Sequence, residues 1–254
     1  MRPAETLLSE LGISDPSDID LRAIAHCVGV EVVSRNLSGC EAQIVGFKNR
    51  AVIFVSEDAR HTRKRFSTGH ELGHWYHHRG ISFVCRREDI GRPIDEKSSD
   101  AERQADAYAA DIILPPFMVA PILKKGSQMT LEVIADIAKR FSASLTAAAL
   151  RVVKMSEQPI ILVAHNLAGK QWQWSSTAAG GLRIRKDLDP RSSPFLALGK
   201  NERLQPVKKE PASYWFDRRH VEQFDVKVQS IQTLEGETLS LLSIPDKRLI
   251  EIYG

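Results

Sequence analysis

The feature that most constrains the fold of this chain is RFSTGHELGHWYHH, residues 65–78, which holds four histidines and a glutamate. Within it, His70, Glu71 and His74 form an HExxH motif in a stretch without proline, which predicts a helix ending near position 80. Residues four apart in a helix lie on neighbouring turns of one face, so both imidazoles can reach one ion. Zinc binds imidazole nitrogen readily, and a glutamate beside the first histidine can take a proton from water. The motif therefore predicts His70 and His74 as metal ligands and Glu71 as the catalytic base.

A site of this kind needs a third protein ligand. In one common pattern it is a histidine six residues after His74, but that position is Gly80. The other solution is a carboxylate on a later helix, and SDAERQADAYAADIILPP, residues 99–116, reads as a strong helix ended by its prolines. There Glu102 would bind the ion. Asp106, one turn later, would accept the free ring N–H of a ligand histidine and fix its tautomer.

A less specific interpretation is that the cluster is a solvated polar helix, since an HExxH pattern can arise by chance. The helical context, the downstream ExxxD pair and the strands that precede the motif together favour the metal site. His77 and His78 follow His74 too closely to complete the coordination of the same ion, so we expect them to pack as scaffold.

The hydrophobic patterning predicts an α+β fold in two halves. Apolar residues alternate in VEVVS, residues 30–34, and on both sides of a polar turn at 48–50, which indicates a small sheet before the histidine helix. The first half is otherwise mainly helical. After Pro159 the pattern changes to strands and turns, and a β-rich part of about a hundred residues follows.

Residues 130–153, TLEVIADIAKRFSASLTAAALRVV, look like a helix-turn-helix. Contact with DNA through the second helix is one interpretation. However, that helix begins SLTAAALR, whose Thr and Ala side chains reach base edges poorly, and its only basic residues, Arg151 and Lys154, lie at its end. The pattern favours packing on the preceding domain or gripping a protein substrate. In the β-rich part, Trp172 and Trp174 at period two indicate strand packing rather than a ligand pocket.

The composition bears on nucleic-acid binding, cellular location and membrane association. The net charge of +3 is far from the concentrated positive charge of a dedicated nucleic-acid binder. Three cysteines at long spacings form no disulfide framework, which favours a reducing, cytoplasmic location. No stretch approaches the roughly 18 apolar residues of a membrane span, so we expect no membrane association.

The segments RKRFSTGHELGHWYHH and AERQADAYAADIILPP together resemble the ImmA/IrrE family of zinc metallopeptidases, over about residues 20–155. The matching positions are Arg65, Phe66, His70, Glu71, Gly73, His74 and His78, then Glu102, Ala105, Ala109, Leu114 and Pro115. Ser67, Gly69, Asp106 and Tyr108 depart from the family pattern, which has Thr, Ala, Asn and Phe at these positions. None of these departures removes a predicted ligand or the base.

The resemblance implies a zincin-like peptidase domain of the gluzincin type over residues 1–120, a helix-turn-helix-like segment over 121–157 and a GAF-like sensor or recognition domain over 158–254. It implies Zn²⁺ as the cofactor, with Mn²⁺ as the alternative. It also implies a zinc endopeptidase that cleaves a partner protein, a helix-turn-helix repressor, and so derepresses stress-response genes. The competing hypothesis is a non-proteolytic transcriptional regulator that binds DNA or a repressor through residues 130–153.

Overall fold

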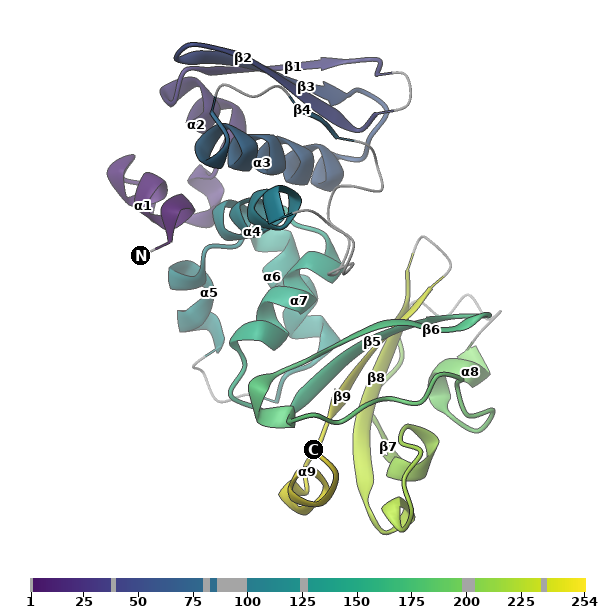
Figure 1. The fold of residues 1–254 in the computed structure, drawn as a ribbon. Coiled ribbons are helices and arrows are strands. Elements are labelled where there is room, and N and C mark those ends of the chain that lie inside the picture. Colours follow the sequence, from purple (N-terminus) through teal and green to yellow (C-terminus); the bar gives the residue numbers. More distant parts are fainter. Residues whose placement is uncertain are drawn as a thin grey trace. The chain divides into compact units, whose positions relative to one another are not determined.

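Two sheets, one in each of two units of the chain, organise the fold (Figure 1). The computed structural model describes residues 2–37, 40–79, 83–85, 100–123, 128–197, 204–233 and 237–254. Contacts divide the chain into one unit of residues 1–124 and 137–147 and a second of residues 125–136 and 148–254. The architecture is mixed α+β, as the sequence predicts, and the three-part division with boundaries after 120 and 157 stays a prediction.

The first unit contains a four-stranded sheet and the helices that carry the histidine motif. Its strands are β1 (Val30–Arg35), β2 (Ala42–Phe47), β3 (Arg50–Ser56) and β4 (Phe83–Cys85). Its helices are α1 (Pro3–Glu10), α2 (Leu21–Cys27), α3 (His61–His77), α4 (Asp100–Ile113) and α5 (Pro116–Leu123), with a short 3-10 turn η1 (Pro16–Asp18). The strand order is β1-β3-β2-β4, in which β1 pairs parallel to β3 and the other pairs are antiparallel.

Strand alternation explains why α3 lies where it does. In β3, Ala51, Ile53 and Val55 are buried, whereas the residues between them are partly exposed. Since successive side chains of a strand point to opposite faces, one face of this sheet is apolar and needs cover. Figure 1 shows α2 and α3 on the same side of the sheet. The β2–β3 hairpin turns tightly at Lys48, whose φ of 55° lies in the left-handed region.

The helix pair predicted from residues 130–153 is present as α6 (Leu131–Arg140) and α7 (Leu145–Met155). The turn between them includes Ser142, which has a positive φ of 50°. Ile134 and Phe141 are buried. A role of this pair in contacting DNA or a protein stays a prediction.

The second unit is built on a five-stranded antiparallel sheet of order β6-β5-β9-β8-β7. The strands are β5 (Ile160–Asn166), β6 (Gly169–Ser175), β7 (Lys208–Pro211), β8 (Asp225–Gln232) and β9 (Thr238–Ser243). Around them lie η2 (Thr177–Ala179), α8 (Ser193–Ala197), η3 (Ala212–Tyr214), η4 (Val221–Gln223) and α9 (Lys247–Tyr253). The first six residues of β5 are all buried, which is typical of a strand covered on both faces.

Aromatic residues of this unit divide between core and surface layers. Trp215 is 1% exposed and packs in a core cluster with Phe216 and Phe224. Trp172 and Trp174 are only half-buried, so the prediction of strand packing holds for them in part. Among the helices that the structure describes, none alone is long and apolar enough to cross a membrane; α4 and α5 pass that test only when taken together as a bent pair.

Candidate metal centre

The middle of α3 is buried although its sequence is polar. Residues 67–75 are all buried, and within them His70 and Glu71 are 0% and His74 is 1% exposed. The solvated-helix interpretation of the histidine cluster is therefore wrong. Buried imidazole and carboxylate groups are costly unless they are hydrogen-bonded, paired or bound to a cation, so this burial itself indicates a built polar site.

Small residues bring α3 against α4. A Cβ atom added to Gly73 would lie 2.7 Å from the Cα of Ala105 and 2.9 Å from its carbonyl oxygen, so the two backbones meet directly. One turn earlier, a Cβ atom added to Gly69 would lie 3.2 Å from the Cα of Ala109. Glu102 lies one turn before Ala105, so this close approach sets the depth at which its carboxylate enters the site.

Three side chains from these two helices converge. The Nε2 atoms of His70 and His74 lie 3.1 Å apart. A Glu102 carboxylate oxygen lies 3.1 Å from Nε2 of His70, and the other lies 3.5 Å from Nε2 of His74. Ligands at about 2.05 Å from a tetrahedral zinc ion are separated by roughly 3.3 Å, so the observed spacings suit such an ion. The group His70, His74 and Glu102 is thus a candidate metal site, as the sequence predicts.

The other ring nitrogens of the two histidines face hydrogen-bond partners on the far side. Nδ1 of His70 lies 2.8 Å from an Asp106 carboxylate oxygen. Nδ1 of His74 lies 3.4 Å from Nδ1 of His78. The first contact is the one predicted for Asp106. The sequence does not predict the second contact, because residue spacing leaves the rotation of the His78 ring open.

Electrostatics of the group follow from this geometry. Burial lowers the pKa of His70, but hydrogen bonds to Asp106 and Glu102 outweigh it and raise that pKa to about 9. Burial likewise opposes ionisation of Glu102, yet hydrogen bonds with His70 and His74 lower its pKa to about 2. The carboxylate is therefore charged, and the group attracts a cation. Because a ligand imidazole must be neutral, binding a metal ion would release the proton of His70.

Glu71, the predicted base, is fully buried beside the first histidine. Its negative charge is one of the causes that raise the pKa of His70. His77 behaves differently. It is exposed, and its ring contacts Tyr76 and Tyr108 edge-on rather than the converging group. That position agrees with the prediction that His77 is scaffold.

The fold and the site together define a class: an α+β protein in which a histidine pair on one helix and a glutamate on the next can hold a metal ion. The family model of the IrrE N-terminal-like domain, a peptidase family, matches residues 25–153, just over half of the 254 residues. The chain belongs to this family, which confirms the resemblance found in the two motifs.

Comparison with solved structures shows a related fold. A structure described as a Mycobacterium tuberculosis transcriptional regulator matches with a TM-score of 0.58 and 16% sequence identity, over 98% of this chain and 78% of that one. At this identity the likeness concerns the fold alone. No curated protein matches the chain in sequence.

Proposed function

We propose that this protein is a zinc-dependent endopeptidase that cleaves a partner protein, a helix-turn-helix transcriptional repressor, and thereby switches on stress-response genes. The observation that carries the proposal is the convergence of His70, His74 and Glu102 beside the buried Glu71. Three protein ligands and a neighbouring carboxylate are the arrangement of a catalytic zinc site, whereas a structural zinc site has four protein ligands. Membership of a peptidase family supports the same class of reaction.

Metal binding, proton transfer and ligand orientation would fall to different residues of the site. His70, His74 and Glu102 would hold the ion, which when bound polarises the scissile carbonyl and makes a water ligand more acidic. Glu71 accepts the proton of the attacking water and passes it to the leaving amine. Asp106 accepts the Nδ1 proton of His70 and keeps Nε2 free for the ion. Zinc is the expected ion, with manganese as the alternative.

The second unit fits a regulatory role in this proposal. Its five-stranded antiparallel sheet would form the GAF-like sensor or recognition domain, and α6 and α7 would grip the protein substrate. The solved structure of similar fold is described as a transcriptional regulator, which agrees with control of transcription. We expect the protein to act in the cytoplasm.

The test is cleavage of the helix-turn-helix repressor whose gene lies nearest to that of this protein. Zinc-loaded parent protein should cut it, and a chelator should stop the reaction. Glu71→Gln should keep the metal and lose activity by about 10²–10⁴-fold, the usual contribution of a general base. Glu57→Gln is the matched control, because Glu57 is exposed and its hydrogen bonds with Arg35 and Lys64 use its backbone rather than its side chain.

Equal rates for the parent and Glu71→Gln would refute the assigned base. A parent protein that cuts no repressor with zinc or manganese, but binds a specific DNA sequence at moderate salt, would replace the peptidase with the non-proteolytic regulator acting through residues 130–153.

A further inference from the structure

His78 ends the row of histidines spaced four residues apart on α3. It is the C-cap of the helix, and its backbone N–H donates to the carbonyl of His74 at 2.8 Å. Its ring is also close to the ring of His74, with centroids 5.5 Å apart and planes tilted by 51°. The two Nδ1 atoms face each other at 3.4 Å. His78 therefore contacts the second candidate ligand on the side away from Glu102.

The proton positions in this contact follow from which nitrogen faces the ion. Nε2 of His74 points to Nε2 of His70 and to Glu102, so Nε2 is the atom that would bind the metal. A neutral imidazole bound through Nε2 carries its proton on Nδ1. That N–H can then donate to Nδ1 of His78, provided that His78 keeps a lone pair there and its own proton on Nε2.

We propose that His78 is a positioning residue, which accepts the Nδ1 proton of His74 and so fixes the tautomer and the ring orientation of that ligand. This inference rests on the proposed function, because it requires that the group binds a metal ion. It makes the site two-sided: Asp106 holds His70 from α4, and His78 holds His74 from the end of α3. Partners of this kind commonly orient ligand histidines.

His78 is not one of the converging ligands, which among the described residues are His70, His74 and Glu102. Its Nδ1 faces Nδ1 of His74, and the ion would lie beyond Nε2, on the opposite edge of the His74 ring. The neighbouring His77 differs from His78, because its ring packs as scaffold and does not contact a candidate ligand. Its contacts among the described residues are ring contacts with Tyr76, His78 and Tyr108.

The experiment compares metal binding in variants of the full chain. In His78→Leu the acceptor is removed, whereas His78→Asn keeps a side-chain oxygen at the position of Nδ1. His77→Leu is the matched control. Zinc affinity is measured by competition with a chromophoric chelator, the ligand field by the visible spectrum of the Co²⁺-loaded protein, and folding by circular dichroism.

We expect His78→Leu to bind zinc about 10- to 100-fold more weakly, the usual effect of losing such a partner, with a changed Co²⁺ spectrum. His78→Asn should remain within a few-fold of the parent, and His77→Leu should equal it. Should His78→Leu not fold, His78→Gln, which carries its amide one bond further out, takes its place and should bind more weakly than His78→Asn.

Two results would overturn the inference. One is an unchanged zinc affinity and Co²⁺ spectrum in His78→Leu. The other is an equal loss of zinc affinity in His78→Leu and His78→Asn. A parent protein that binds neither zinc nor cobalt would refute the proposed function itself, and this outcome is seen before any variant is made.

Discussion

Replacing Gly73 with alanine tests whether the close approach of α3 and α4 builds the site. The added Cβ would lie 2.7 Å from the Cα of Ala105, 2.9 Å from its carbonyl oxygen and 3.0 Å from the Cβ of Tyr108. Two of these three atoms belong to the backbone of α4 and cannot rotate away. Ordinary carbon–carbon contacts begin near 3.5 Å, so the helices must separate by about 0.8 Å or deform.

The expected change in the free energy of unfolding of Gly73→Ala comes from two opposing effects. Overpacking of this kind costs about 1–3 kcal/mol, whereas alanine in a helix interior gains up to about 1 kcal/mol over glycine. We therefore expect a net loss of up to about 2 kcal/mol in the free energy of unfolding. Glu102 lies one turn before Ala105 and moves with α4. Since ligand distances in metal sites are held within about 0.2 Å, a shift of this size should weaken zinc binding at least tenfold.

The assays are urea unfolding of the metal-free protein and zinc competition with a chelator. Gly69→Ala is the control, because its Cβ would meet Ala109 and Ile112 at 3.2–3.3 Å, a distance that asks neighbours to give by only a few tenths of an ångström. That variant should stay within about 1 kcal/mol of the parent and bind zinc normally. If Gly73→Ala unfolds at the same urea concentration as the parent and binds zinc equally, the packing does not set the site.

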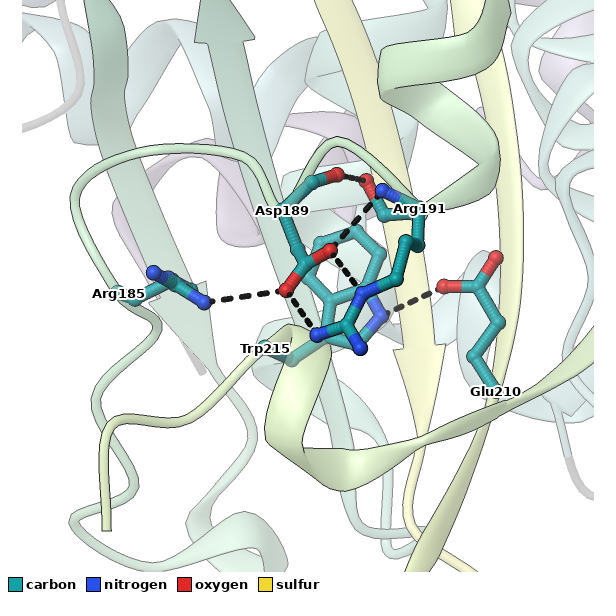
Figure 2. A network of polar contacts seen from close by, with 6 residues as sticks. Arg185, Asp189, Arg191, Glu210 and Trp215 are labelled. Atoms are coloured by element: carbon teal, nitrogen blue, oxygen red, sulfur yellow. Dashed lines mark hydrogen bonds and ion pairs between the residues drawn. The ribbon is translucent and has the colours of Figure 1, made fainter. Parts of the chain in front are cut away.

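Three further predictions concern other contacts. Glu102→Ala should lower zinc affinity more than 100-fold in an equilibrium dialysis measurement, because it removes a ligand. Gln229 is buried, accepts from the Leu131 amide at 2.6 Å and donates to Glu132 at 2.7 Å; Gln229→Ala should cost about 1–3 kcal/mol and speed hydrogen exchange of that amide. Asp189 accepts hydrogen bonds from Arg191, which lower its pKa to about 2 (Figure 2). The stabilisation by this carboxylate is present above its unfolded pKa near 3.8 and is lost as pH falls towards 2. At pH 6 the free energy of unfolding of the parent, measured with urea, should therefore exceed that of Asp189→Asn by about 1 kcal/mol, a value reduced for screening because Arg191 is exposed. The two free energies should converge near pH 2.

The parts of the first unit that depend on local periodicity could be predicted from the sequence. The four-residue spacing of His70 and His74 places both rings on one face of α3 whatever surrounds it, and the same spacing relates Glu102 to Asp106 on α4. An HExxH motif also needs a third ligand, and since position 80 is glycine, the expected source is a carboxylate on the later helix. The structure brings these side chains together, with the Asp106 contact at 2.8 Å.

Contacts between distant segments could not be predicted in the same way. The strand order of the second unit depends on pairings such as that of β5 with β9, about 80 residues apart, and alternation alone does not state which strand lies beside which. The bond from the Gln229 side chain to the start of α6 is likewise invisible in a sequence, because Gln229 is one of several polar residues in β8, whose sequence is DVKVQSIQ. Its burial, not its type, shows that it has a partner.

His78 shows the same limit within a single helix. Spacing places the Cβ atoms of His70, His74 and His78 in one row, but it leaves the rotation of each ring open, and ring rotation decides whether Nδ1 or Nε2 faces the ion. Packing of α4 against α3 fixes that rotation, since Glu102 draws both Nε2 atoms to one point. Each Nδ1 then faces outward and needs an acceptor. The row therefore does not offer three ligands to one ion: its last member stands where a partner for the second ligand is required.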